Sequence, residues 1–271
     1  MGIIRCGING VQSRVSAVHA LIVHCHPELE SFNRALTEVA GATLREQGFS
    51  VDVSDLYNQD FDPCERAEHY VNRDDSAVFS PLREQRHASE TNTLPEDVQR
   101  EIARLKRADL VLFQFPIWWH GQPAILKGWF DRVFVNGSLY TSAMRYDRGY
   151  FRGRRAVCSI TTGAPEVAFG PGSRGGDIER ILWSTHYSLH YMGFDVLPPF
   201  VAFGIQGHGY TYLDDEENDR HLNVIRETWK ERLKTLDREK ALRFHGWGDW
   251  DQDGRSKTGK PGRLTERSFR V

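Results

Sequence analysis

The sequence has few of the residues and patterns that would place it in several common protein classes. Only 4 of its 271 residues are cysteine, and no two of them form a Cys-x-x-Cys pair. Free thiols of this kind are typical of a reducing compartment rather than of a disulfide framework, so we expect a cytoplasmic protein. No apolar run reaches the ~18 residues of a membrane-spanning helix, so no membrane span is expected. The chain also has no large excess of charge of one sign, since 35 basic and 37 acidic residues leave a net charge of −2. Nucleic acid is therefore not an expected partner.

The composition is that of a folded protein with appendages. Hydrophobic residues make up 39% of the chain and aromatic residues 11%, enough for one good core. Residues 1–17 are too polar for a secretory signal and are predicted to form a disordered arm, although Arg5 and Arg14 without an acid leave a transit-like arm open. We predict a folded domain over residues 18–240. Residues 241–271 are predicted to form a C-terminal tail, or an arm that docks on a partner.

Hydrophobic periodicity predicts an alternation of strands and helices. Short apolar strands are expected at 20–23, 51–53, 110–113, 156–160 and, as a fifth strand, within 196–203. Apolar residues recur at helical spacing within 32–43, 98–105, 178–189 and 222–236, and a further helix is expected after Pro123. The polar stretch 56–94 shows no firm period and is predicted to be a long insertion after the second strand. The alternation predicts an α/β fold with a doubly wound, parallel, five-stranded sheet and helices on both faces.

The most informative segment is 115–134, FPIWWHGQPAILKGWFDRVF, which directly follows the third predicted strand. Pro116 cannot continue a ladder, so a loop begins there. Loops at the carboxyl ends of parallel strands are where such sheets bind ligands. The adjacent Trp118 and Trp119 would suit a flat aromatic ligand, and ordinary burial in the core is the alternative for both rings.

Two other loops are expected at the same edge of the sheet. The turn from His26 to Asn33 opens a helix, and the free N–H groups there suit a phosphate or pyrophosphate. Ser31 is either a plain N-cap or also a phosphate contact, and His26 is either a phosphate contact or a solvated loop residue. The segment Thr161–Ala164 follows a strand and offers hydroxyl and backbone groups to the polar edge of a flavin ring.

These segments, in this order, resemble the NAD(P)H:quinone oxidoreductase family of flavodoxin-like flavoproteins, the DT-diaphorase type. The resemblance covers roughly residues 19–240 and includes 176–183, GDIERILW, and 193–199, GFDVLPP. It implies a ping-pong, two-electron hydride reduction of quinones by NAD(P)H, with FAD rather than FMN as cofactor, and a homodimer with two shared sites. The cofactor-binding residues that it implies are His26, Ser31, Phe32, Asn33, Pro116, Ile117, Trp118, Trp119, Thr161, Thr162, Gly163 and Ala164.

The resemblance also suggests the substrate side of the site. Trp119 matches a position that flanks the flavin ring and the substrate, and Tyr140 matches a substrate-pocket tyrosine, whereas Ser142 replaces a second one. His120 stands where mammalian members carry Phe. Because histidine titrates near neutrality, His120 either donates a proton to the quinone or lies on a solvated rim. We take His120 and Tyr140 as the candidate catalytic residues.

Three departures from the family pattern are visible. Ala164 stands where relatives have a second glycine, and Phe169 and Gly175 stand where mammalian members carry a tyrosine and a histidine proposed to offset charge on the reduced flavin. Neither side chain can donate a proton, so a different proton route or substrate is expected. A flavodoxin-type electron carrier and a regulatory or ancillary subunit remain as alternatives. No metal is expected, since His186 and His190 lack an evident third ligand.

Overall fold

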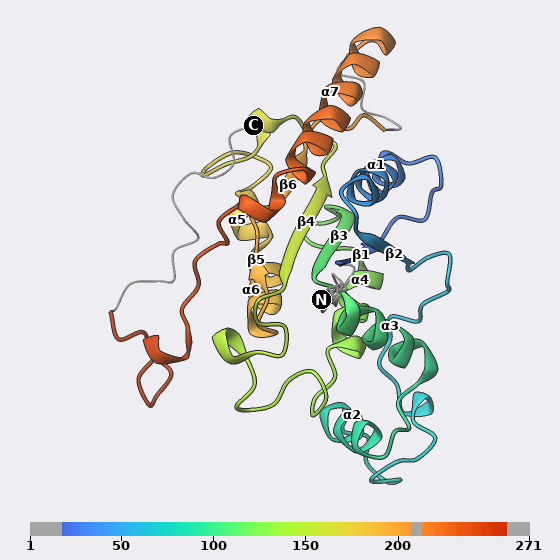
Figure 1. Ribbon diagram of the computed structural model, residues 1–271, viewed down its shortest axis with the longest axis vertical. Coiled ribbons are helices and arrows are strands. Elements are labelled where there is room, and N and C mark those ends of the chain that lie inside the picture. Colours follow the sequence, from blue (N-terminus) through green and yellow to red (C-terminus); the bar gives the residue numbers. More distant parts are fainter. Residues whose placement is uncertain (1–17, 208–212, 259–271) are drawn as a thin grey trace, which may run out of the picture.

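A parallel sheet forms the centre of the protein. The computed structural model describes residues 18–207 and 213–258. Its strands run in the order β2-β1-β3-β4-β5, with β6 also paired to β4 (Figure 1). Their bounds are β1 His19–His24, β2 Ser50–Asp55, β3 Leu110–Pro116, β4 Arg155–Thr161, β5 Asp195–Val196 and β6 Phe200–Ala202. The predicted doubly wound parallel sheet is confirmed.

The fifth predicted strand is present in two pieces. Strand β5 pairs with the start of β4, and β6 pairs with its end, from Ser159 to Thr161. Between the two pieces lie Pro198 and Pro199, which have no N–H to donate to a ladder. The sheet therefore has five strand positions, and the prolines interrupt the pairing at the last one.

Helices cover both faces of the sheet. Alternate side chains of β1 show this, because Ala20 and Ile22 belong to one core cluster whereas Leu21 and Val23 belong to the other. The helices α1 Phe32–Glu46 and α7 Asp215–Leu233 pack on the first face (Figure 1). The second face carries α3 Glu96–Arg107, α4 Ala124–Val133, α5 Ile178–Ile181 and α6 Trp183–Tyr191. Short 3₁₀ helices lie at Ala67–His69, Tyr146–Arg148, Glu166–Ala168, Leu236–Arg238 and Trp247–Asp249. Within the described residues, no helix is long and apolar enough to cross a membrane.

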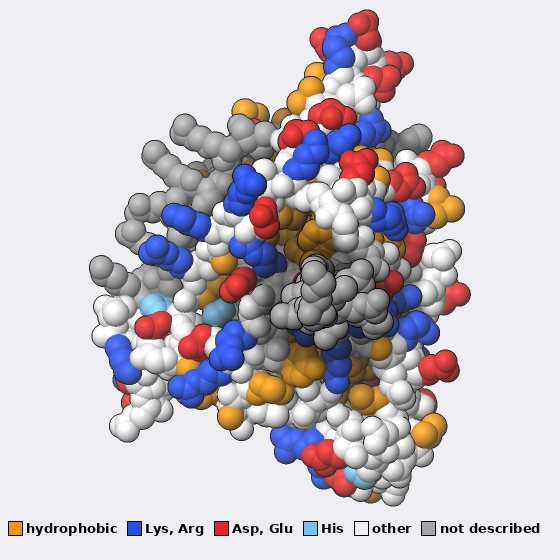
Figure 2. Space-filling model, viewed as in Figure 1, with side chains coloured by type: hydrophobic (Ala, Val, Ile, Leu, Met, Phe, Trp, Pro, Cys, Tyr) orange, Lys and Arg blue, Asp and Glu red, His pale blue; other side chains and the backbone are white. Residues whose placement is uncertain are grey.

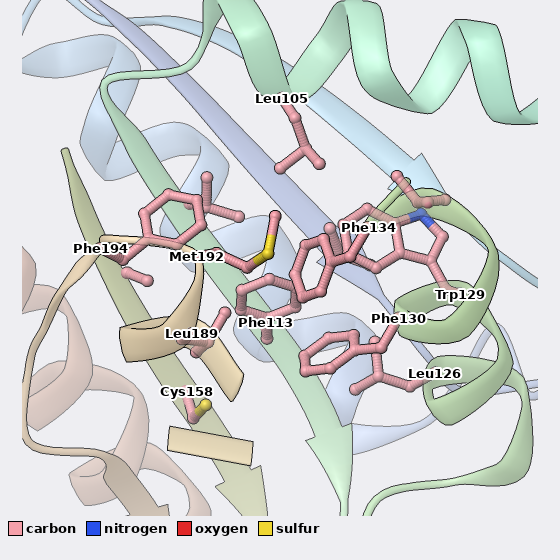
Figure 3. Packing of buried hydrophobic residues seen from close by; sticks show 14 of the residues in the cluster. Leu105, Phe113, Leu126, Trp129, Phe130, Phe134, Cys158, Leu189, Met192 and Phe194 are labelled. Carbon is pink, nitrogen blue, oxygen red and sulfur yellow. The ribbon is translucent and has the colours of Figure 1, made fainter. Parts of the chain in front are cut away.

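An aromatic cluster anchors α4 on the sheet. The Trp129 ring packs edge-on against Phe113 of β3 at 5.8 Å between centroids, and Phe130 lies 4.9 Å from Phe134 (Figure 3). The indole N–H of Trp129 donates to the buried carboxylate of Glu101 at 3.0 Å. Edge-to-face ring pairs add to simple area burial. The position of α4, and so of the loop that leads into it, is fixed by this packing.

The insertion 56–94 contains a helix that the hydrophobic pattern did not reveal, α2 Pro81–Glu90. Its buried face is polar, because Glu84 and Gln85 are buried there beside a single alanine. The Glu84 carboxylate accepts hydrogen bonds from the Arg73 guanidinium at 3.2 Å and from the Asp74 N–H at 2.8 Å. A helix held by a polar network leaves no apolar stripe in the sequence, which is why periodicity missed it.

The described part of the C-terminal segment packs against the chain itself. The Trp250 ring lies 4.6 Å from the Tyr146 ring, and the Trp247 ring lies 5.9 Å from it. The Trp247 N–H donates to the Asp147 carboxylate at 2.7 Å. The domain boundary at residue 240 stays a prediction, and the predicted arm 1–17 lies outside the described residues.

Two glycines in helices give a matched test of the packing. A Cβ atom on Gly128 of α4 would lie 2.1 Å from the Pro63 carbonyl oxygen, whereas one on Gly41 of α1 would meet only the flexible end of Arg45, at 3.1 Å. Alanine favours a helix over glycine by about 1 kcal/mol. We expect Gly41→Ala to raise the free energy of unfolding by up to about 1 kcal/mol. Gly128→Ala should instead lower it by about 1–3 kcal/mol through overpacking. Urea unfolding of both variants checks this, and equal shifts would contradict the close approach of Pro63 to α4.

Candidate functional site

A chain of two buried amides and one hydroxyl ties the carboxyl ends of β3 and β4 to the first turn of α1. Gln114 of β3 donates from Nε2 to Asn33 Oδ1 at 2.9 Å, and Asn33 Nδ2 donates to Thr161 Oγ1 of β4 at 3.0 Å. All three side chains are buried. Asn33 lies in the first turn of α1, so this chain fixes the start of that helix relative to the loop that follows Thr161.

The start of α1 offers unpaired donors. Ser31 is the N-cap, and its Oγ accepts from the Arg34 N–H at 3.2 Å. The backbone N–H groups of Phe32 and Asn33 have no acceptor among the described residues. A helix N-terminus with free N–H groups suits an anion such as a phosphate. The contact between Ser31 and a phosphate stays a prediction.

His26 links this turn to the tryptophan loop. Its ring lies 6.0 Å from the Trp118 ring, and its Nδ1 accepts a hydrogen bond from the Glu28 N–H at 3.1 Å. Burial lowers the pKa of His26 from its ordinary value, so the neutral imidazole is favoured. Nε2 of a neutral ring in this tautomer carries the proton and can donate it in a hydrogen bond to a ligand.

The tryptophan loop is a tight turn with a strained backbone. Trp118 and Gly121 exchange two backbone hydrogen bonds, of 3.0 and 3.1 Å, across the central residues Trp119 and His120. Both central residues have positive φ, 50° and 58°. Side chains other than glycine adopt this region at a cost, and such strain is typical of functional sites. The turn leaves the Trp119 side chain 99% exposed.

A cavity of about 570 Å³ lies between this turn and the loop after β4. Six predicted site residues line it: Ile117, Trp119, His120, Thr162, Gly163 and Ala164. Four further lining residues are Ala168, Phe169, Arg174 and Gly175. The other predicted cofactor contacts border the cavity instead: Pro116 and Thr161 end their strands, Trp118 lies beside His26, and Ser31, Phe32 and Asn33 begin α1.

The loop after β4 is held rigidly and presents its amides. Thr162 Oγ1 donates to the Ala164 carbonyl at 2.9 Å, and the N–H groups of Gly204 and Ile205 donate to the Ala164 and Thr162 carbonyls. The N–H groups of Gly163 and Ala164 have no acceptor in the part of the chain that the structure describes. Free donors beside an open, largely apolar space fit the polar edge of a flavin ring.

Phe169 and Gly175, the two departures from the family pattern, depend on each other. A Cβ atom on Gly175 would lie 3.0 Å from the Phe169 ring and 2.8 Å from the Ala168 carbonyl oxygen. No larger side chain fits there without movement of the backbone. A side chain at position 175 is therefore opposed mainly by the Ala168 carbonyl oxygen, with the Phe169 ring in tight contact beside it.

Tyr140 lies away from His120 in the single chain. It lines a second cavity, of about 280 Å³, between α2, α4 and α6. Its ring packs edge-on against Tyr191 at 5.5 Å, and burial raises the pKa of its phenol. Within one chain, the predicted cofactor residues lie around or beside the cavity that the Trp119–His120 turn lines. The two candidate catalytic residues, His120 and Tyr140, line different cavities.

Sequence reasoning missed two charged residues near the site. Arg174 lines the main cavity, and Arg226 of α7 places its guanidinium 5.1 Å over the Phe32 ring. The glycine-rich run around Arg174 was a usable signal for a loop at a ligand site, whereas nothing local marks Arg226. No group of three or more metal-ligating side chains occurs within residues 18–207 and 213–258.

The chain is similar to known quinone oxidoreductases along most of its length. A family model described as a flavodoxin-like fold matches residues 18–231. NAD(P)H dehydrogenase [quinone] 1 of Cavia porcellus is 40% identical over 227 residues, which are 83% of this chain and 79% of that protein. Ribosyldihydronicotinamide dehydrogenase [quinone] of Mus musculus is 36% identical over 82% of this chain and 93% of that protein.

A solved structure agrees with these matches. A Klebsiella pneumoniae protein, assigned as a candidate quinone reductase, superposes with a TM-score of 0.81 at 29% identity, over 92% of this chain and 98% of its own. The fold is therefore that of a flavodoxin-like oxidoreductase. The chain belongs to the NAD(P)H:quinone oxidoreductase family, as the tryptophan-loop motif predicted.

The buried amide chain can be tested by removing its central member. Asn33→Leu keeps the size of the side chain and leaves Gln114 and Thr161 without their shared partner. We expect the free energy of unfolding to fall by about 1–3 kcal/mol, the cost of buried polar groups left unsatisfied. Asn58→Leu, at an exposed turn position, is the control and should stay within about 0.5 kcal/mol of wild type. Similar losses in both variants, measured by denaturant unfolding, would show that the chain does not hold the strand ends.

Proposed function

We propose that the protein is a flavin-dependent NAD(P)H oxidoreductase that reduces quinones or similar flat acceptors by two electrons. The observation that carries the proposal is the cavity between the Trp119–His120 turn and the Thr162–Ala164 loop, with unpaired amides along the second loop. A bound flavin would supply the hydride chemistry there. In this proposal Trp119 is a wall of the slot and His120 gives a proton to the acceptor; both residues line the cavity, which supports these roles. We infer that the nicotinamide and the quinone use this slot in turn, as in a ping-pong cycle.

We propose FAD rather than FMN as the cofactor. Arg226 stacks on Phe32 beside the free N–H groups of the first α1 turn. A guanidinium at this point supplies charge for a second phosphate, or a flat surface for an adenine. Both NADH and NADPH are proposed as co-substrates. Nitroaromatic and azo compounds are proposed as further acceptors in the same slot.

We further propose a homodimer with two shared sites. The separation of Tyr140 from His120 supports it, because a second copy could bring its Tyr140 cavity to the exposed Trp119 side chain. A cytoplasmic location is also proposed, supported by the free thiols of Cys25, Cys64 and Cys158. A regulatory or ancillary subunit is the second candidate function, since neither Phe169 nor Gly175 has a side chain that can donate a proton. The balanced charge speaks against a flavodoxin-type electron carrier, and Figure 2 shows basic and acidic side chains interspersed over the face in view.

Flavin content and turnover decide between these functions. We expect the purified protein to be yellow, with about one flavin per chain, released as FAD and identified by chromatography. Steady-state oxidation of NADH and NADPH should then depend on an added quinone. A flavin-loaded protein without turnover would favour the ancillary subunit, and failure to bind either flavin in a saturating titration would end the proposal.

The proton role of His120 is tested by His120→Phe. If the imidazole is the donor, the variant should slow the half-reaction in which the acceptor is reduced. A positioned acid contributes about 10²–10⁴-fold. Because quinones are easily reduced, we expect about ten- to a hundredfold slowing of acceptor reduction. Stopped-flow measurement of each half-reaction should show reduction by NAD(P)H nearly unchanged. His87→Phe, on α2, is the control. Equal slowing of both half-reactions, or no effect, would make His120 a rim residue only.

A further inference from the structure

Arg174 lies at the rim of the main cavity without a partner. It is exposed, it lines the cavity with His120 and Gly175, and no hydrogen bond, ion pair or ring contact engages it in the described parts of the chain. The acid nearest in sequence, Asp177, is engaged elsewhere, since it caps α5 by accepting from the Glu179 N–H at 2.9 Å. The charge of Arg174 is therefore unpaired within residues 18–207 and 213–258.

The backbone that carries Arg174 is fixed rather than open. Gly170 and Gly176 close the loop with a 2.9 Å hydrogen bond, and the Gly176 N–H donates to the Ser173 carbonyl at 3.0 Å. A Cβ atom on Gly176, which has a φ of 81°, would lie 3.7 Å from the His120 ring. The loop thus packs against the tryptophan turn and holds Arg174 at the mouth of the cavity.

The cavity is positive at its rim and carries no acid. Among its ten lining residues, Arg174 and His120 are the only side chains that can bear charge, and Ile117, Ala168 and Phe169 form apolar walls. A cavity with apolar walls on one side and one unpaired guanidinium among its lining residues is complementary to an aromatic ring that bears an anionic substituent. Guanidinium groups bind carboxylate, sulfonate-like and phosphate oxygens through paired N–H donors.

We propose that Arg174 is a specificity-determining residue that binds an anionic group on the ligand entering this cavity. The inference rests on the proposed function and names its substrate class: a flat aromatic acceptor bearing a carboxylate or sulfonate. A phosphate of the nicotinamide nucleotide has the same chemistry and is the other source of the anion. The two sources act in different half-reactions, which separates them experimentally.

The test compares a neutral naphthoquinone with the same ring carrying a sulfonate. The variants are Arg174→Gln, which removes the charge, and Arg174→Lys, which keeps it without the planar fork. Arg180→Gln is the matched control, because Arg180 is 88% exposed on the neighbouring helix and does not line the cavity. We expect Arg174→Gln to lower kcat/KM for the sulfonated quinone by about three- to tenfold, the range between an exposed ion pair and a hydrogen bond to a charged group. The neutral quinone should change less than about twofold.

The controls and half-reactions distinguish the outcomes. Arg174→Lys should retain part of the preference, Arg180→Gln should match wild type, and added salt should weaken the preference. If Arg174→Gln instead slows the reduction of the protein by NADPH and NADH, the anion that Arg174 binds is a nucleotide phosphate. The proposed anion site is then still supported. Equal effects on charged and neutral acceptors with both nucleotides, or no effect, would overturn the proposal.

A binding measurement keeps this inference separate from the proposed function. Isothermal titration of the flavin-loaded protein with naphthalene sulfonate, which cannot be reduced, should show binding that weakens about three- to tenfold in Arg174→Gln. Such binding without any NAD(P)H oxidation would leave the anion site intact and remove the proposed activity. If the protein turns over quinones but binds naphthalene sulfonate equally well with and without Arg174, the proposed activity stands and the anion site is ruled out.

Discussion

The buried hydrogen-bond chain from Gln114 through Asn33 to Thr161 is the constraint on which the site depends. The strand order β2-β1-β3-β4 reverses direction between β1 and β3, and in open α/β sheets the crevice at such a point binds the ligand. Each member of the chain comes from a different element: a strand, the first turn of α1, and the next strand. In a low-dielectric interior such bonds are strong and costly to leave unmade. One amide at the start of α1 therefore sets the spacing between the anion-binding turn and the loop with free amides.

The opposite side of the site depends on apolar packing that carries local strain. The Trp119–His120 turn has two residues with positive φ, and it stays in place because α4 directly after it is locked to β3 through Trp129. The facing loop is set by the contact of Phe169 with Gly175, which leaves no room for a side chain at the second position. Phe169 and Ala168 give this side of the cavity an apolar wall. His120 and Arg174 are the two of its ten lining residues whose side chains can carry charge.

How far the fold followed from the sequence depended on what each element buries. Strands and helices with an apolar face were predicted, because burial of one face makes apolar residues recur every 2 residues in a strand and every 3.6 residues in a helix. The helix α2 was missed because its buried face is Glu84 and Gln85, held by hydrogen bonds. The stripe over 178–189 was predicted as one helix, but the structure has two helices that meet at Leu182. Leu236, included in the last stripe, lies beyond the end of α7 in a 3₁₀ turn. Periodicity records burial and does not mark such breaks.

The sequence by itself determined the sheet, the order of the site loops and the membership in the family, since these depend on local periodicity and on a long contiguous motif. It also placed the predicted cofactor residues at one edge, because parallel strands end together. Only the tertiary structure decided that Tyr140 lies in a separate cavity and that Gly175 is confined by the Ala168 carbonyl and the Phe169 ring. It also decided that Arg174 has no partner among the described residues. Each of these features depends on the distance between segments that are separate in the sequence, and the order of the elements does not fix that distance. Packing and charge pairing at that range exist only once the sheet has assembled.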